Sequence, residues 1–582
     1  VRDLDSGVAS QNLRVTSQIA GNAISPIGNA AGALGDTVTA TSFISAATSS
    51  EDKPFENFDS DVWNLDNDKL EHRFPYHKIG YDSPVKDIAT VDEFFTELVK
   101  TRASSHYRII KDLTITGARW QQFTEETGLN SLGTDTAAVR GRLEGAVSII
   151  SGGKYTTRAA NITLTNFTDN QMKLYHSLFG YTNSFKMSNL NFIYEFDYNV
   201  RAVNQDLNEF ALLMLSTNAT TLNNIGVTLA TQTDEDNVEK HTLKFDNLGE
   251  SSTIQNLAIV AARSYNSVFN NVRFDAKVSA ANFVASTPEF TMGALVGQSN
   301  GTLTIGGVDQ GWVEVSYNSP NNYQAYVGAL VGRANGVVNL SGAVNKTGNI
   351  RGIVNVETTG YQPSFVGGVV GLANSTINLK NFTSNVAINL TRHNSDPNNS
   401  SIDYVGGITA TINRSNISGA CVLGDISVRG GNGVLYLGGI AGTYTNSHNF
   451  ASNYSGFTTQ NSSCYSKISI TGDSPYSQIY VGGIYGLTTE QITMQNGLAE
   501  PQGESKNIYY ALYSSADINV DTQASYIYAG GVIGKAQQGI MQVDSEDETQ
   551  FTYTPFTKPN VMLRVASCGF IGDLIVNNDQ MT

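Results

Sequence analysis

Short runs of alternating apolar and polar residues fill much of the chain beyond residue 105. Clear examples are DISV from Asp425 and KISI from Lys467. A period of two, with β-branched residues at the apolar positions, is typical of strands. Between residues 251 and 535 no apolar stripe repeats every 3.6 residues, which argues against helical repeats. The pattern therefore predicts an all-β fold.

One hexapeptide recurs along this region and defines a repeat. Its copies are MGALVG, VGALVG, VGGVVG, VGGITA, LGGIAG, VGGIYG and AGGVIG, with first glycines at Gly293, Gly328, Gly367, Gly406, Gly438, Gly482 and Gly530. Glycine lets the backbone bend or approach a neighbour closely. Units of two strands and a glycine corner cannot bury an apolar face alone, but copies stacked about 4.8 Å apart share one core. The repeat predicts a parallel β-helix, or solenoid, over residues 105–582, with each hexapeptide at the same position of successive coils.

These hexapeptides, together with the segments SSCYSKISITG from Ser462 and GACVLGDISVRG from Gly419, resemble GLUG repeats. Upstream segments are similar to those that accompany such repeats: ATVDEFFTELVKTRASSHYRIIKDLTITGARW from Ala89, RGRLEGAVSIISG from Arg140 and LFGYTNSFKMSNLNF from Leu178. GLUG repeats are found on large bacterial surface proteins, including adhesin-like proteins and IgA-specific peptidases. The resemblance spans roughly residues 85 to 575 and implies a β-helix-like stack. Residues 142–145 and the final alanine of VGGITA depart from the family pattern.

The first 104 residues differ in character from the repeats. Residues 1–48 form an Ala/Gly/Ser-rich tract, interpreted either as a mobile terminus or as an arm of extra strands for self-association through Leu13, Val15, Ile19, Ile24 and Ile27. Residues 49–104 combine an aromatic segment, expected to plug the solenoid or to offer a sugar-binding platform, with one short helix over 91–100. Thr90 and Glu93 have the spacing of a capping box. We expect this helix to cover an open sheet edge.

Composition and charge limit the classes of binding partner that the chain can have. Charged residues make up only 15% of the chain, and the net charge is -16 with a pI near 4.9. Binding to nucleic acid or an anionic membrane needs a basic patch, so both are excluded. No apolar run approaches the roughly 18 residues of a membrane helix. With few cysteines and no start Met, the chain is interpreted as a mature form or fragment of an extracellular, cell-surface protein.

Candidate chemistry is sparse. Cys421, Cys464 and Cys568 each precede a strand and are interpreted as a ladder of small thiols, in which the first two would bridge if they lie in adjacent coils. An odd third cysteine and the lack of CxxC argue against zinc. The acidic runs at 234–236 and 544–548 lack the pattern of an EF-hand. No metal or cofactor site is expected.

Two functions from different classes follow. The first is a non-enzymatic structural or adhesive protein, either a cell-surface adhesin segment or a filament subunit. Its partners would be copies of itself, joined head to tail by strand addition. Host or matrix glycans or proteins are the other partners considered. Residues 570–576 have the pattern of a strand, and an uncovered edge there would recruit strands from other chains. The alternatives to self-association are truncation of a longer chain and a compact monomer. The second function is a glycan-processing β-helix enzyme, a lyase or hydrolase, which two carboxylates about 5 to 10 Å apart in a groove would favour.

Overall fold

The computed structural model describes most of the chain beyond residue 84. The described residues are 14–16, 36–38, 63–64, 76–77, 85–151, 154–199, 208–229, 242–246, 251–252, 254–281, 284–285, 289–307, 311–319, 323–342, 348–393, 400–449, 458–472, 476–494, 505–543, 551–554, 561–566 and 568–577. The chain divides into two compact units. One comprises residues 1–87, 104–107 and 148–157, and the other comprises 88–103, 108–147 and 158–582.

The first unit contains pairs of short strands. β1 (Arg14–Thr16) pairs in parallel with β2 (Asp36–Val38), and β3 (Trp63–Asn64) pairs antiparallel with β4 (Tyr76–His77). β9 (Val147–Ser151) and β10 (Lys154–Arg158) form another two-stranded sheet. Most of the predicted aromatic segment lies outside the described residues.

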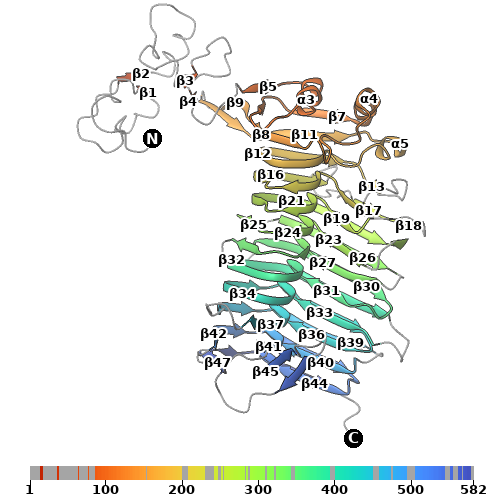
Figure 1. Ribbon diagram of the computed structural model, residues 1–582, viewed down its shortest axis with the longest axis vertical. Helices are drawn as coiled ribbons and strands as arrows, with labels where there is room; N and C mark the ends of the chain where they lie inside the picture. The colour runs from red at the N-terminus through yellow and green to blue at the C-terminus, as the bar shows by residue number, and fades with distance from the viewer. Residues whose placement is uncertain are drawn as a thin grey trace, which may run out of the picture. The chain divides into compact units, whose positions relative to one another are not determined.

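The second unit is a parallel β-helix, as predicted (Figure 1). A nine-stranded parallel sheet contains β14 (Glu209–Ala211), β19 (Asn256–Ala258), β23 (Glu289–Gly293), β27 (Gln324–Gly328), β31 (Ser364–Gly367), β33 (Ile402–Gly406), β36 (Val434–Gly438), β40 (Gln478–Gly482) and β44 (Tyr526–Gly530). The last seven of these strands each end at the first glycine of a hexapeptide. The strands that follow the glycine corner are β15 (Met214–Asn218), β20 (Ala261–Tyr265), β24 (Val296–Asn300), β28 (Val331–Ala334), β32 (Val370–His393), β34 (Thr409–Val422), β37 (Ala441–Asn449), β41 (Tyr485–Met494) and β45 (Ile533–Val543). The all-β solenoid prediction is confirmed.

Further strands lie before, between and after these, and most of them complete the coils. They are β5 (Lys86–Ile88), β6 (His106–Ile109), β7 (Leu113–Thr116), β8 (Val139–Gly145), β11 (Ala160–Thr165), β12 (Phe179–Glu195), β13 (Tyr198–Asn199), β16 (Thr221–Leu229), β17 (Thr242–Phe245), β18 (Ser251–Ser252), β21 (Val268–Ala281), β22 (Val284–Ala285), β25 (Leu303–Gly306), β26 (Gly311–Ser319), β29 (Val338–Ser341), β30 (Ile350–Thr359), β35 (Ile426–Gly430), β38 (Thr458–Cys464), β39 (Lys467–Gly472), β42 (Ser505–Ser514), β43 (Asp517–Thr522), β46 (Phe551–Thr554), β47 (Val561–Ala566), β48 (Gly569–Phe570) and β49 (Leu574–Asn577). The predicted strand alternation is present: Ile426 and Val428 are buried, and Ser427 between them is not. The inward positions of successive coils form the core.

Asparagines make one of the corners between strands. Asn189, Asn224 and Asn271 stack on one another and have φ angles of 56°, 56° and 49°. Asparagine tolerates this left-handed conformation better than most residues. The amide of Asn224 donates to Asn189 Oδ1 at 2.8 Å, and that of Asn271 donates to Asn224 Oδ1 at 3.0 Å. The asparagine-rich composition thus contributes to the stacking of coils.

Helices lie at the N-terminal end of the solenoid (Figure 1, top). The predicted helix is α3 (Val91–Leu98), where the Thr90 and Glu93 side chains make the reciprocal bonds of a capping box. Two further helices, α4 (Gly117–Thr127) and α5 (Asp169–Met172), were not predicted. Thr116 caps the N-terminus of α4, and Gly128 ends it in the left-handed conformation, at φ 72°. The cap therefore contains helices that the prediction of a single helix missed.

Aromatic packing holds this cap together. The ring of Phe95 from α3 stacks on that of Phe123 from α4 at 4.5 Å, and Trp120 lies 4.7 Å from Tyr175. Trp120 is fully buried, and its indole N–H donates to the Leu174 carbonyl at 3.1 Å. Burial of such rings accounts for most of the stabilisation that this cluster can provide.

Candidate functional site

The hexapeptide glycines form a register column in the nine-stranded sheet. Gly328 pairs with Gly367, and the column continues through Gly406, Gly438, Gly482 and Gly530; Gly293 pairs with Ala258 of the preceding coil. A Cβ at Gly367 would lie 1.9 Å from the carbonyl oxygen of Val370, three residues further on. The corresponding distances at the other six glycines are 2.0 to 2.6 Å. The repeat therefore needs glycine because the corner brings a carbonyl oxygen into the space of a side chain.

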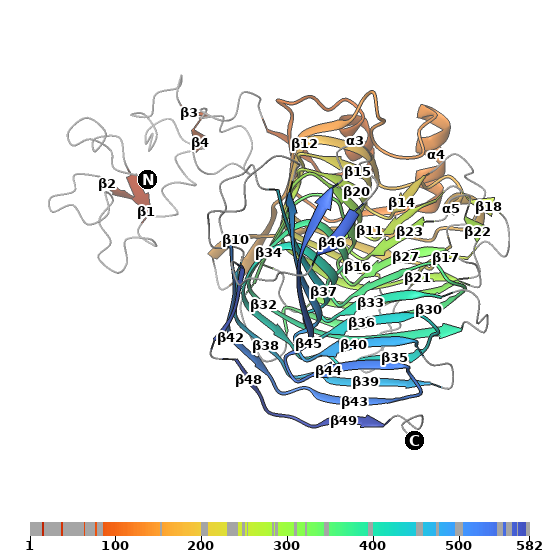
Figure 2. The same ribbon diagram turned by 60° about the horizontal axis from the view of Figure 1, so that its bottom comes forward.

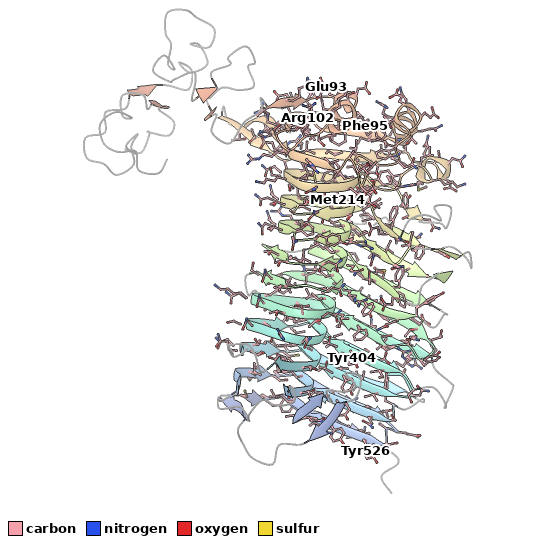
Figure 3. The ribbon with its side chains drawn as sticks, viewed as in Figure 1. Glu93, Phe95, Arg102, Met214, Tyr404 and Tyr526 are labelled. Atoms are coloured by element: carbon pink, nitrogen blue, oxygen red, sulfur yellow. The ribbon has the colours of Figure 1, made fainter. Side chains whose placement is uncertain are left out.

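A row of stacked aromatic rings runs beside this column on the outer face of the sheet. The rings of this aromatic ladder are Tyr326, Phe365, Tyr404, Tyr436, Tyr480 and Tyr528, and successive centroids lie 4.7 to 5.1 Å apart. Figure 3 labels Tyr404 within the row. Each ring immediately precedes a hexapeptide, so extending the motif by one residue could have revealed the ladder. Arg333 lies 4.6 Å from the Tyr326 centroid and Lys535 lies 4.1 Å from that of Tyr528.

The ladder leaves few ring faces for a ligand. Each inner ring stacks on a neighbour on both sides, and the two outermost rings have a cation over them. Burial raises the pKa of both Tyr326 and Tyr436 to about 12, so these hydroxyls stay protonated near neutral pH. The ladder therefore stabilises the stack of coils, and sugars or bases would have to bind elsewhere.

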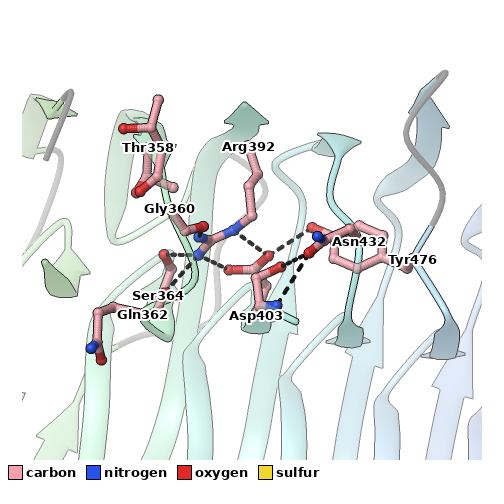
Figure 4. Close-up of polar contacts among 10 residues, drawn as sticks. Thr358, Gly360, Gln362, Ser364, Arg392, Asp403, Asn432 and Tyr476 are labelled. Carbon is pink, nitrogen blue, oxygen red and sulfur yellow. Dashed lines mark hydrogen bonds and ion pairs between the residues drawn. The ribbon is translucent and has the colours of Figure 1, made fainter. Parts of the chain in front are cut away.

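A buried ionic cluster joins three coils inside the solenoid (Figure 4). Arg392 and Asp403 are fully buried and form an ion pair, with Arg392 Nε donating to Asp403 Oδ2 at 2.8 Å. The guanidinium also donates to the Gly360 carbonyl at 2.8 Å and to Ser364 Oγ at 2.7 Å. Tyr476, 73 residues from Asp403, donates its hydroxyl to the same carboxylate at 2.8 Å. Burial, followed by the Asp403 charge, raises the pKa of Tyr476 well above its ordinary value.

This cluster is structural in character. Its charges are matched and bonded, and no polar atom of Arg392 or Asp403 is left unsatisfied among the described residues. A buried pair of this kind is costly to break but leaves no free group for chemistry. Sequence reasoning missed it because Arg392, Asp403 and Tyr476 lie in loops and strand ends of unequal length.

The cysteines do not form the predicted ladder. Cys421 pairs with Ser463, whereas Cys464 pairs with Val422, so the two thiols occupy adjacent coils but different register positions. Since successive residues of a strand point to opposite faces, they cannot align or bridge. Cys568 precedes β48, and none of the three cysteines forms a disulfide. Burial raises the pKa of Cys464 to about 11, and its sulfur packs where a Cβ of Gly439 would lie.

Other predicted residues fall partly outside the described structure. Val15 lies in β1, while Leu13, Ile19, Ile24 and Ile27 lie outside the described residues. The acidic runs 234–236 and 544–548 lie outside them too. Within the described part of the chain, no three His, Cys, Asp or Glu side chains gather closely enough to hold a metal ion. No helix there is long and apolar enough to cross a membrane.

Exposed apolar side chains gather at the C-terminal end of the solenoid, where β49 is the last strand (Figure 2). Nine large apolar side chains are exposed among the described residues, and five of them lie here: Tyr526, Ile571, Leu574, Ile575 and Val576. Ile571 is the most exposed, at 68%. β49 pairs with β43 on one edge, and among described strands nothing pairs with its other edge.

A polar hollow of about 360 Å³ lies near this end, on the outer side of β35, β39, β43 and β49. Arg429, Thr471, Asp521 and Asn577 line it and form one register column across the four strands. Gly472, Thr522 and Gln523 complete the lining. The hollow combines a cation, an anion and neutral polar groups.

Comparison with known proteins identifies no relative. No protein-family model, curated protein or solved structure matches this chain. The resemblance to GLUG repeats rests on the hexapeptides and their flanking segments alone.

Proposed function

We propose that this chain is a non-enzymatic structural protein of the cell exterior, either an adhesin segment or the subunit of a self-assembling filament. The observation that carries the proposal is the exposed apolar edge at the C-terminal end of the solenoid, where Ile571 and Ile575 are 68% and 48% exposed. Unpaired strands recruit strands from other chains. A contact between two unlike surfaces that does not close into a ring produces a filament.

The partner proposed for this end is the N-terminal tract of a second copy. β1 and β2 pair in parallel, which is the pairing that each further coil of the solenoid uses. Direct stacking onto the N-terminal end of another solenoid is disfavoured, because α3 and α4 pack there over β7. The N-terminal tract, which contains β1 and β2, is therefore the segment that we propose to pair with the C-terminal end of another copy.

The composition of the polar hollow supports this function over the glycan-processing enzyme. Asp521 is the one carboxylate among its lining residues, whereas glycoside hydrolysis generally uses a pair of carboxylates. On the adjoining sheet face, Ser316, Asn355, Asn389, Ser427 and Ser469 form a column of neutral side chains. Neutral side chains of this kind suit a scaffold or contact surface.

Light scattering and electron microscopy of the full chain test the proposal. We expect concentration-dependent assemblies, and we expect both deletion of residues 1–45 and the Ile571→Lys substitution to reduce them to monomers. Val99→Lys is the matched control, since Val99 is 41% exposed at the opposite, capped end. A wild-type chain that stays monomeric at all concentrations, or assemblies that survive both changes, would refute the proposal.

A further inference from the structure

We infer that the polar hollow binds an uncharged, hydroxyl-rich glycan that lies across strands β35, β39, β43 and β49. The inference goes beyond self-assembly, because it concerns the outer face of the solenoid rather than its terminal edge. It rests on which side chains line the hollow, on their spacing, and on their lack of other partners.

The spacing of the hollow is fixed by the sheet. Arg429 pairs with Thr471, Thr471 with Asp521, and Asp521 with Asn577. Neighbouring strands lie about 4.8 Å apart, so these four residues present a polar group every ~4.8 Å over roughly 14 Å. A linear oligosaccharide lying along the column would meet a new side chain at each step. Because the backbone of a strand is rigid, the groups are pre-positioned for such a ligand.

The lining groups are available for binding. Arg429, Asp521 and Gln523 are exposed. Within the described part of the chain, none of these three side chains makes a hydrogen bond or ion pair, in contrast to Arg392 and Asp403 nearby in the sequence. Gly472, at φ 148°, brings no side chain to the turn beside them. The hollow therefore holds donors and acceptors that no described side chain or backbone group engages.

The mixture of charges selects the class of ligand. Arg429 can donate several hydrogen bonds and Asp521 can accept several, while the amides of Gln523 and Asn577 do both. An anionic sugar would face the Asp521 carboxylate, and a cation would face the Arg429 guanidinium. Hydroxyl groups donate and accept, so a neutral glycan satisfies both ends without an uncompensated charge.

The geometry also disfavours other polymers. An extended peptide recognised by strand addition binds along an open sheet edge, but the column runs across the face of four strands that are paired with one another. Nucleic acid binding requires several cations to displace counterions, and the lining contains one, Arg429. A glycan is the polymer that fits a polar column across a sheet face.

Titration calorimetry and saturation-transfer NMR with the full chain test the inference. The probes are the uncharged tetrasaccharides of β-1,4-linked glucose, α-1,4-linked glucose, β-1,4-linked mannose and β-1,4-linked N-acetylglucosamine, with tetragalacturonate as the anionic comparison. We expect at least one uncharged probe to bind, and Arg429→Gln and Asp521→Asn each to weaken it about tenfold. Lys467→Gln, an exposed change on the same sheet face outside the hollow, should leave binding unchanged.

Three results would overturn the inference: no uncharged probe binds, only tetragalacturonate binds, or binding is insensitive to both hollow variants. Circular dichroism of each variant verifies that the fold is intact, which is expected because both substituted side chains are exposed. Light scattering of the same samples separates this result from that of self-assembly, since neither variant alters Ile571 or residues 1–45.

Discussion

At the N-terminal end of the solenoid, α3 and α4 bury Phe95, Trp120 and Phe123 over the first coils, whereas at the C-terminal end Ile571 and Ile575 face solvent. Figure 3 labels Phe95 among the helices of one end and Tyr526 at the other. Both ends belong to the same stack of parallel coils, and both would otherwise present unpaired strands. A stack whose coils contact only their neighbours needs a cap for solubility. The contrast is that α3 and α4 cover one end, whereas apolar side chains remain exposed at the other; closure of this second end by another copy is the proposal that the following experiments test.

Removal of the cap should have the largest effect. Trp120→Ala eliminates a fully buried ring and its hydrogen bond, and we expect the free energy of unfolding of the first coils to fall by about 3–5 kcal/mol. Ile575→Ala at the open end should change stability by less than about 0.5 kcal/mol. Hydrogen exchange resolved along the chain measures both. Equal loss of protection in the two variants would show that the ends do not differ.

A substitution in the buried ionic cluster tests whether this cluster stabilises the coils between the cap and the open end. Tyr476→Phe keeps the ring but removes the hydroxyl that donates to Asp403. We expect a loss of about 1.5–3 kcal/mol, because a hydrogen bond to a buried charge is lost. The loss should appear as faster amide exchange in β33, β36 and β40 while α3 and α4 stay protected. Tyr526→Phe, at a ring that is 61% exposed, is the control and should have no effect.

Corner glycines can be compared with a glycine elsewhere in the same solenoid. Gly367→Ala places a Cβ 1.9 Å from the Val370 oxygen, while Gly311→Ala places one 3.5 Å from Phe274, an ordinary contact. We expect Gly367→Ala to cost about 1–3 kcal/mol and Gly311→Ala to cost nothing or to stabilise slightly. Thermal unfolding followed by circular dichroism gives the difference. Equal midpoints would contradict the steric account of the repeat.

The smallest expected effect is a pH dependence confined to the capped end. The bidentate hydrogen bond from Arg158 lowers the pKa of Asp112 below its ordinary value near 4. A lowered pKa in the folded state stabilises the protein above the unfolded value, and this contribution is lost as the pH falls through the folded value. Both side chains are about 40% exposed, so solvent screening limits the contribution to less than about 1 kcal/mol.

Asp112→Asn should therefore reduce the loss of stability of the first coils as the pH falls from about 5 to 3. Arg158→Gln should do the same, because either change removes the ion pair. Urea midpoints at a series of pH values provide the measurement. A variant with the full acid dependence of the wild type would rule out this pair as a contributor.

The sequence predicted the glycine corners and the capped helix, which have local signals, and missed contacts that depend on how separate coils align. The hexapeptides revealed the coils because the corner excludes every side chain at its first glycine, so that constraint recurs in each copy. The capping box at Thr90 similarly identified α3, since a cap is a local signal. By contrast, the ion pair of Arg392 and Asp403 depends on how unequal loops bring distant residues together. The cysteine ladder failed for the same reason, because a shift of one register position reverses which face a side chain occupies.

The polar hollow was beyond sequence reasoning for a related reason. Arg429, Thr471, Asp521 and Asn577 are separated by intervals of 42, 50 and 56 residues. Their alignment follows from the register of four strands and from no recurring motif. Because loop lengths vary between coils, the sequence does not show which surface residues align across strands, even where the fold itself is predictable.

The dependence of amide hydrogen exchange on protein concentration tests most directly whether the open end is closed by a second copy. The full chain would be measured at low and high concentration, with exchange resolved in β44, β45 and β49 and, as an internal reference, in α3 and α4. We expect exchange in the C-terminal strands to slow as the concentration rises, while exchange in the helical cap stays constant. Exchange in β44, β45 and β49 that is the same at every concentration would contradict it.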